Sequence, residues 1–325
     1  MTSASHQRWD ELLGNIVGLL PAGPACVLID GDGEQAVALA RRLTTALTAD
    51  GRSTPAATIE LGDGARGRRA RHWDVVIWPR VTANGHPGRE DGHPGREDGE
   101  IGADIVVDLH DLSWPVIRRV AAPLAGRCPW YVAETRAFFS PRAATWDTRF
   151  GDDMPAYAAA VARAHIPEGG VVVDVGCGTG RALPALRQAV GPRGTVIALD
   201  LTPEMLREAR RRGRAAHAAL FLADARQLPF ADASVDAVFA AGLVMHLPDT
   251  EAGFGQLARI TRPGGLLILF HPSGRAALAA RHGRTLRPDE PLTAAPLRRI
   301  THDAGWQLTA YDDAADHFLA IAIRD

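Results

Sequence analysis

The stretch VVVDVGCGTG at residues 171–180 is the part of the sequence best suited to bind a ligand. An apolar, β-branched run that ends in closely spaced glycines is typical of a buried strand followed by a tight turn. Glycine lets a ligand approach the backbone, and the start of a following helix presents free N–H groups. The pattern is G-x-G-x-G, whereas dinucleotide-binding loops have G-x-G-x-x-G and phosphate-binding loops end in Gly-Lys-Ser/Thr. It therefore differs from both of these loops.

Three carboxylates lie at or near the ends of successive predicted strands. Asp174 stands two residues before the first glycine, Asp200 ends the next strand, and Asp224 comes just after the third. Because the carboxyl ends of parallel strands meet at one edge of a sheet, we expect these side chains to lie along that edge. Asp174 would repel a pyrophosphate and attract a cationic amino-acid group, Asp200 is placed for ribose hydroxyls, and Asp224 for an adenine amino group. The sequence predicts a cationic nucleoside ligand.

Residues 131–325 resemble a class I S-adenosylmethionine-dependent methyltransferase of the kind that acts on small molecules. Besides the glycine stretch, the resemblance is carried by ALDLTPEML at 198–206, ADA at 223–225, SVDAVFAAGLVMHLPD at 234–249 and RPGG at 262–265. It implies that S-adenosyl-L-methionine is the cofactor, with its methionine part at the glycine loop, its ribose at Asp200 and its adenine beside the later residues. The implied donor-binding residues are Asp174, Gly176, Cys177, Gly178, Thr179, Gly180, Asp200, Leu201, Met205, Asp224 and Ala225.

Two histidines are the catalytic candidates, His246 after the fourth predicted strand of this domain and His271 at the end of the fifth. Methyl transfer needs the acceptor aligned with the methyl group in a site cleared of water, and an oxygen or nitrogen acceptor also needs a base. Histidine is the side chain best suited to that role near neutral pH, although either residue could simply pack or cap. No Cys/His cluster predicts a metal site.

Four arginines lie between the fifth and sixth strands: Arg275, Arg281, Arg284 and Arg287. They fit either a clamp for a carboxylate or phosphate on the acceptor or a solvated basic helix face. Aromatic residues at 138–157 fit either a cap that closes over the donor or a plain hydrophobic cover.

Strands and helices alternate along the chain, which predicts an α/β protein with two domains. Residues 1–128 are expected to form a smaller α/β domain and residues 129–325 a Rossmann-like methyltransferase domain with a seven-stranded sheet. The first domain has predicted strands at 26–30, 56–61, 74–78 and 104–109 and helices at 34–49 and 114–124. The second has strands at 171–175, 195–200, 219–223, 234–240, 266–270, 307–311 and 317–323, the last two forming an antiparallel edge.

Residues 27–43 resemble the strand, loop and helix of a uridine-kinase-like P-loop domain, with a faint extension at 103–111. Gln35-Ala36-Val37 replaces the expected Gly-Lys-Ser/Thr, so the phosphate-binding lysine and the magnesium hydroxyl are missing. Asp30, Asp32 and Glu34 would repel a triphosphate. We expect a degenerate domain with a scaffolding, dimerising or substrate-presenting role. The tandem GHPGRED repeat at 85–98 is predicted to be a loop, and its His86 and His93 lack the partners of a metal site.

The composition limits the remaining function classes. The 325 residues carry a net charge of −2 and include no lysine, which excludes Schiff-base and other lysine chemistry. No basic excess favours nucleic acid or a membrane surface, no apolar run approaches the ~18 residues of a membrane span, and no signal peptide is evident. We expect a cytoplasmic protein with a small-molecule acceptor and a possible homodimer. The alternatives are a non-catalytic sensor of the methyl donor, a bifunctional nucleotide-binding protein and a NAD-type Rossmann domain.

Overall fold

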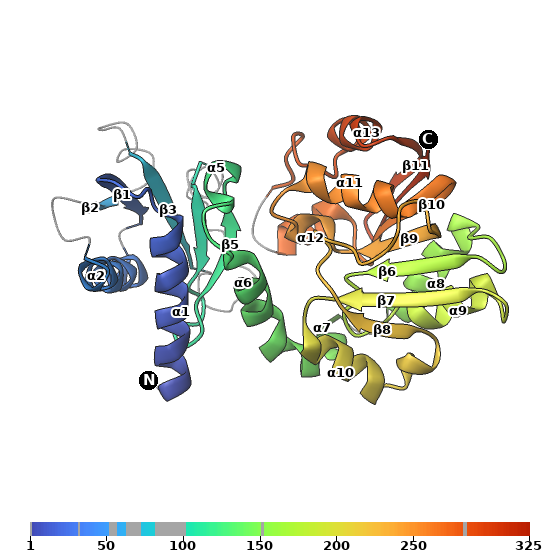
Figure 1. Cartoon of the computed structure of the whole chain (residues 1–325), viewed down its shortest axis with the longest axis horizontal. Helices are drawn as coiled ribbons and strands as arrows, with labels where there is room; N and C mark the ends of the chain where they lie inside the picture. Colours follow the sequence, from blue (N-terminus) through green and yellow to red (C-terminus); the bar gives the residue numbers. More distant parts are fainter. Residues whose placement is uncertain are drawn as a thin grey trace. The chain divides into compact units, whose positions relative to one another are not determined.

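The computed structural model describes residues 2–31, 33–51, 57–62, 73–81, 102–150, 153–281 and 285–325. It divides into two compact units, Met1–Phe138 and Phe139–Asp325, shown in Figure 1. The tandem repeat at 85–98, Asp32 and Arg284 lie outside the described residues. Among the described helices, none combines the length and the hydropathy that a bilayer crossing requires.

The first unit contains a five-stranded sheet in the order β2-β1-β3-β4-β5. The first four strands of this order are parallel, and β5 runs antiparallel to β4. Its strands are β1 (Ala25–Asp30), β2 (Ala57–Gly62), β3 (Val75–Arg80), β4 (Ile105–Asp108) and β5 (Val116–Val120), and its helices are α1 (Ser3–Leu19), α2 (Glu34–Ala49), α5 (Ala122–Ala125) and α6 (Trp130–Phe139).

The predicted helix at 114–124 is wrong, because residues Val116–Val120 form strand β5. Val116, Ile117 and Val120 are buried, and this spacing of apolar residues fits one face of a helix as well as a strand. Pairing with β4 and a backbone hydrogen bond from Ile117 to the buried carboxylate of Glu134, at 2.8 Å, select the strand. Long-range partners therefore overrode the local pattern.

The boundary between the units lies after Phe138, whereas the sequence suggested a boundary after Cys128. The difference comes from α6, which the first unit holds through a buried ion pair. Glu134 on α6 accepts a hydrogen bond from the guanidinium of Arg8 on α1 and another from Asn15 Nδ2 at 2.7 Å. A helix with such an anchor belongs to the unit that supplies its partner.

The second unit contains a seven-stranded sheet in the order β11-β12-β10-β9-β6-β7-β8. The strands are β6 (Val171–Val175), β7 (Thr195–Asp200), β8 (Ala219–Leu222), β9 (Val235–Ala241), β10 (Thr261–His271), β11 (Trp306–Asp313) and β12 (Phe318–Arg324). All neighbours are parallel except β12, which runs antiparallel to both β10 and β11. This sheet confirms the seven predicted strands and the antiparallel edge.

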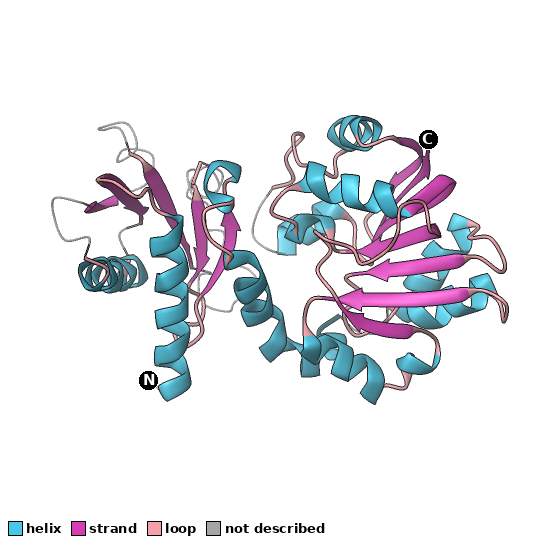
Figure 2. Cartoon of the chain, in the orientation of Figure 1, coloured by secondary structure: helices cyan, strands magenta, loops and turns pink. Residues whose placement is uncertain are grey.

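Helices cover both faces of this sheet, as Figure 2 shows. They are α7 (Trp146–Phe150), α8 (Met154–Ala164), α9 (Leu183–Val190), α10 (Pro203–Arg211), α11 (Thr250–Ile260), α12 (Arg275–Arg281) and α13 (Ala294–Asp303), with short 3₁₀ turns η1 (Ser140–Thr145), η2 (Arg214–Ala216) and η3 (Val244–His246).

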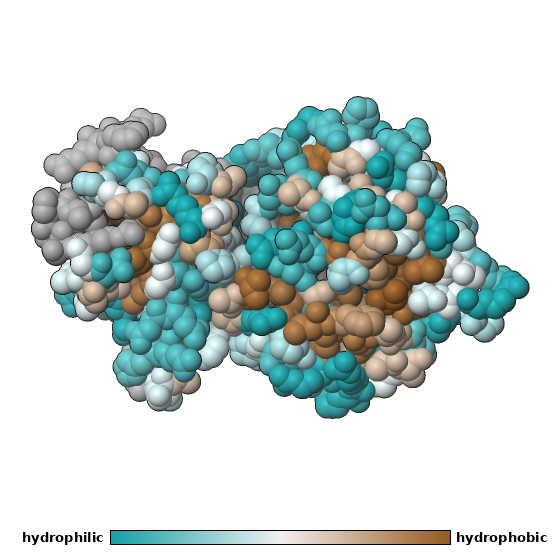
Figure 3. Space-filling view, viewed as in Figure 1, coloured by the Kyte–Doolittle hydropathy of each residue, from teal (hydrophilic) through white to brown (hydrophobic). Residues whose placement is uncertain are grey.

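Neighbouring residues of the central strand β6 enter different hydrophobic clusters. Val172 packs with Leu186 of α9, whereas Val173 packs with Phe254 of α11. A strand buried on both faces favours apolar residues, which explains the four valines of β6, and the buried Asp174 is the exception. Figure 3 shows that hydrophobic residues also reach the visible surface of this unit, and the large exposed apolar side chains among its described residues are Phe221, Leu222, Met245 and Ile323.

Candidate active site

The glycine loop joins β6 to α9 and has a backbone that only glycine adopts easily. Gly176, Gly178 and Gly180 have φ angles of 73°, 54° and 79°. A Cβ on Gly176 would lie 3.0 Å from Leu243 Cδ1, and one on Gly180 would lie 2.8 Å from Leu183 Cδ1. The spacing of the three glycines therefore follows from left-handed conformation and close packing.

Most of the N–H groups of this loop donate within the protein. Gly176 and Cys177 both donate to Leu199 O, at 2.8 and 2.9 Å, and Gly180 donates to Cys177 O at 2.8 Å. Gly178 donates to Asp200 Oδ2 at 2.8 Å, so four of the five N–H groups are engaged. An anion-binding loop presents its N–H groups to the ligand. This loop is therefore poorly suited to a pyrophosphate, in agreement with its glycine spacing.

Asp174, which is buried, and Asp200, which is half-buried, are two carboxylates close enough to influence each other. Asp174 is 2% exposed and its Oδ1 atom has no hydrogen-bond partner. Burial, reinforced by the charge of Asp200, raises the pKa of Asp174 to about 8. Burial also raises the pKa of Asp200, although the N–H groups of Gly178 and Thr202 bind its two oxygens at 2.8 and 2.7 Å. A cationic or hydrogen-bond-donating ligand would relieve both groups.

The other predicted donor-binding residues lie just after β7, on α10 and just after β8. Met205 on α10 is buried and Leu201, directly after β7, is partly buried. Asp224 and Ala225 follow β8, as the sequence predicts. The carboxylate of Asp224 is held by Arg226, with Nη2 at 2.7 Å from Oδ2. An adenine amino group would therefore have to share this carboxylate with Arg226.

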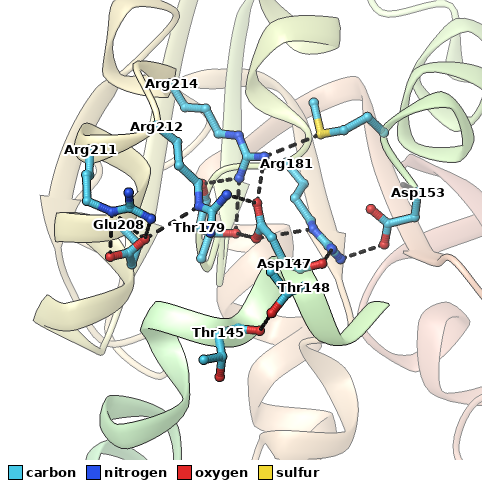
Figure 4. Close-up of polar contacts among 11 residues, drawn as sticks. Thr145, Asp147, Thr148, Asp153, Thr179, Arg181, Glu208, Arg211, Arg212 and Arg214 are labelled. Carbon is cyan, nitrogen blue, oxygen red and sulfur yellow. Dashed lines mark hydrogen bonds and ion pairs between the residues drawn. The ribbon is translucent and has the colours of Figure 1, made fainter. Parts of the chain in front are cut away.

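A cluster of arginines holds the segment 140–150, here named the cap segment, which contains η1 and α7. Its central group is Asp147, which accepts a hydrogen bond from Thr179 Oγ1 at 2.5 Å, as Figure 4 shows. Arg214, Arg212 and Arg181 approach the same carboxylate at 2.8, 3.3 and 3.4 Å. Burial alone would raise the pKa of Asp147, but the hydrogen bonds from Thr179 and Arg214 and the arginine charges outweigh it and lower that pKa.

Two further contacts fix the cap segment and its surroundings. Ser140 Oγ donates to Glu204 Oε2 on α10 at 2.7 Å, and buried Arg181 binds Asp153 at 2.5 Å. Because the hydroxyl of Thr179 donates to Asp147 in the cap segment, a contact between Thr179 and the methyl donor would have to use the main-chain N–H of this residue. Sequence spacing gave no signal for this cluster, because its members come from distant positions.

Replacing Asp147 by asparagine is expected to loosen the cap segment. The variant keeps the shape of the side chain but removes the charge that offsets three guanidinium groups, so we expect the free energy of unfolding to fall by about 1–3 kcal/mol. Trypsin should also cleave faster after Arg142. The control is Asp232→Asn, whose carboxylate pairs with Arg259 but is 77% exposed. Equal effects of the two variants on stability and cleavage would contradict the inference that Asp147 holds the cap segment in place.

The two candidate catalytic histidines have different surroundings. His246 lies in η3, with its ring edge-on to Phe139 and the ring centroids 5.1 Å apart. His271 ends β10, and its Nδ1 lies 3.0 Å from Ser273 O. Because a carbonyl oxygen only accepts hydrogen bonds, neutral His271 carries its proton on Nδ1 and keeps the lone pair on Nε2. His271 also lines a cavity at the ends of β9 and β10.

Of the two alternatives for the arginines between the fifth and sixth strands, a clamp of all four does not assemble among the described residues. Arg281, which is exposed, donates through Nη2 to Ser273 Oγ at 2.9 Å, and Arg287, which is half-buried, pairs with Asp289 at 2.6 Å. Arg275 alone is buried and lines the cavity with His271. Within the described ranges, no group of three or more His, Cys, Asp and Glu residues is arranged to hold a metal ion.

Comparisons with known proteins identify the domain that carries these features. A family model described as a methyltransferase domain matches residues 173–269. A malonyl-[acyl-carrier protein] O-methyltransferase of Xylella fastidiosa is 45% identical over 105 residues, which cover 31% of this chain and 35% of that protein. An uncharacterised protein of Mycobacterium bovis is 39% identical over 142 residues, 42% of this chain and 49% of its own length. The chain thus spans a third to a half of the length of these relatives.

One solved structure among those that resemble this chain is a SAM-dependent methyltransferase from Aquifex aeolicus. It shares 21% sequence identity, with a TM-score of 0.44, and the match covers 60% of this chain and 98% of that one.

Proposed function

We propose that the protein transfers a methyl group from S-adenosylmethionine to a small-molecule acceptor, because residues 173–269 match a methyltransferase-domain family model. The observation that carries the proposal is the pair of carboxylates beside the glycine loop, Asp174, which is buried, and Asp200, which is half-buried and binds the N–H of Gly178. Two carboxylates in a low-dielectric site favour a cationic ligand with hydroxyl donors, which describes S-adenosylmethionine.

The glycine loop, Asp174 and Asp200 would each bind a different part of the methyl donor. The donor supplies an electrophilic methyl group on a sulfonium. Asp174, whose Oδ1 atom lacks a partner, would accept from the ammonium group, and Asp200 from the ribose hydroxyls. Leu201 and Met205 would pack on the adenine, and Asp224 with Ala225 would contact its edge. Gly176 to Gly180 would let the methionine part approach the backbone.

The acceptor would bind at the cavity between the ends of β9 and β10. Leu243 lines this cavity and also packs against Gly176, so the same side chain adjoins the glycine loop. An acceptor in this cavity would therefore lie close to the methyl group of a donor bound at the glycine loop. His271, with the Nε2 lone pair, would take the proton from an oxygen or nitrogen nucleophile. The named relative from Xylella fastidiosa is an O-methyltransferase, which supports an oxygen nucleophile.

The test is donor binding and turnover by the full chain. Wild-type protein should bind S-adenosylmethionine in calorimetry and transfer isotope-labelled methyl groups to a component of a metabolite extract. Asp200→Ala should weaken donor binding by roughly tenfold or more, because it removes a charged hydrogen-bond acceptor. Asp303→Ala, at a carboxylate that is 59% exposed, should bind the donor like the wild type. Absence of donor binding at millimolar concentration would contradict the proposal.

The same assay separates the two kinds of donor-binding protein. Binding with methyl transfer supports the enzyme, whereas binding without transfer to any metabolite would favour a non-catalytic sensor of the donor or its product.

We propose further that the first unit is a non-catalytic domain derived from a uridine-kinase-like P-loop protein. In the structure β1 leads through Gly33 into α2, which begins at Glu34 with no lysine nearby in a chain that has none. Asp30, at the end of β1, is fully buried. A negative side chain at this point and the missing lysine both disfavour a nucleoside triphosphate. Specific binding of ATP with magnesium to the first unit would contradict this proposal.

A further inference from the structure

The cavity at the ends of β9 and β10 has room for only one small chemical group. It offers about 20 Å³, close to the space that one water molecule occupies. Its walls are mostly apolar and include Leu269, Phe270 and Phe318, with polar groups from His271 and Arg275. Met245 also lines it and is 49% exposed, so the wall of the cavity extends to the surface. Only the end of a larger molecule would enter.

Arg275 is an unusual residue to line such a cavity, because its guanidinium is buried and not all of its N–H groups have hydrogen-bond partners. The side chain is 8% exposed, and its Nε donates to Asp313 Oδ2 at 2.9 Å. The backbone N–H of Arg275 donates to Asp313 Oδ1 at 3.0 Å, which fixes the start of α12 against the end of β11. The buried Nη1 atom has no hydrogen-bond partner.

A buried donor without a partner is costly, on the order of 1–3 kcal/mol and more for a charged group. Native proteins satisfy nearly all such atoms with protein, water or ligand partners, so Nη1, on a side chain that lines the cavity, has the capacity to bind a ligand atom. Nη1 can only donate, so that ligand atom is an acceptor. Guanidinium groups match carboxylates in charge and in planar geometry, and the pairing is strong when water is excluded.

Taking these observations together, and on the basis of the proposed function, we infer that the methyl acceptor carries a carboxylate group that binds Arg275 Nη1 in this cavity. Arg275 thereby selects acidic acceptors and anchors them beside His271. Asp313 holds the guanidinium in place and also competes with the acceptor for its charge. Removal of Asp313 should therefore have the opposite effect on carboxylate binding from removal of Arg275.

The test compares carboxylic acids with their neutral amides in the full chain saturated with S-adenosylhomocysteine. The probes are acetate, propionate and benzoate against acetamide, propionamide and benzamide, with binding followed by ligand-observed NMR. Wild-type protein should prefer at least one acid over its amide by roughly tenfold to a hundredfold. Arg275→Met combined with Asp313→Asn, which leaves no buried charge unpaired, should lose this preference. Asp313→Asn alone should increase it.

The outcomes are distinguishable from a failure of the proposed function. Each variant is first checked for its melting temperature and for binding of S-adenosylmethionine, which depends on Asp174 and Asp200 and should be unchanged. If the donor binds but acids and amides bind equally to the wild type, the carboxylate inference is wrong and the methyltransferase proposal stands. If Asp313→Asn weakens acid binding as much as the double variant does, Arg275 and Asp313 are only a structural pair, which also overturns the inference.

Discussion

Asp174→Asn is expected to abolish most donor binding and at the same time to stabilise the unliganded protein. Asp174 is buried with an unpartnered Oδ1 atom, and burial together with Asp200 raises its pKa to about 8. Asparagine has nearly the same shape but no charge, so it loses the attraction to a cationic donor. We expect donor affinity to fall roughly tenfold to a hundredfold, measured by calorimetry.

The stability effect should depend on pH in a defined direction. In the unfolded chain Asp174 loses its proton near its ordinary pKa of 3.8, whereas in the folded chain it keeps the proton up to about pH 8. The folded state therefore binds more protons between these values, and the stability of the wild type falls as the pH rises from about 4 to about 8. The asparagine side chain does not titrate, so the variant should avoid this fall and gain about 1 kcal/mol or more at pH 8, roughly 2–4 °C in melting temperature.

The affinity for the methyl donor should also depend on pH, in the direction opposite to the stability of the unliganded protein. A cationic donor favours the ionised form of Asp174, so binding should release a proton below pH 8 and strengthen as the pH rises toward that value. The asparagine variant should lose this pH dependence. Asp303→Asn, at an exposed carboxylate, serves as the control and should change neither stability nor affinity. A variant that is less stable than the wild type at pH 8 would refute the proposed electrostatic cost.

Glu134→Gln is expected to destabilise the first unit by about 3–5 kcal/mol while leaving donor binding intact. Glu134 is fully buried and accepts hydrogen bonds from Arg8, Asn15 and Ile117, so it joins α1, α6 and β5. The glutamine leaves the buried guanidinium of Arg8 with only the half-exposed carboxylate of Glu11 as a counter-charge and places an NH₂ group against donors. Breaking a buried ion pair in this way is strongly destabilising.

Hydrogen exchange followed by mass spectrometry measures this effect for each unit separately. Peptides from residues 2–138 should exchange faster in the variant, and peptides from the second unit should not. The matched control is Glu11→Gln, which removes the other carboxylate that pairs with Arg8, at 3.1 Å, but from a side chain that is 50% exposed. The control should cost less than about 1 kcal/mol. Equal protection loss in both units would show that they do not unfold independently.

Local sequence was sufficient for the elements that place the glycine loop and the carboxylates. The valine run of β6 predicts a strand buried on both faces, and the positive φ angles at Gly176, Gly178 and Gly180 explain the glycine spacing. Asp174 and Asp200 follow from the same reasoning, because their positions near the strand ends depend only on strand length and direction. Short-range geometry determines these features, so a short stretch of sequence contains the information.

Tertiary structure decided the features that depend on partners distant in the chain. Strand β5 replaced a predicted helix because β4 and Glu134 offered its backbone hydrogen bonds. The arginines around Asp147 come from positions 181 to 214, and Arg275 meets Asp313 across 38 residues. Periodicity reports which face of an element is apolar but not which charged side chain will stand opposite it. The identity of those partners is settled only when folding brings the strand ends together and removes water from between them.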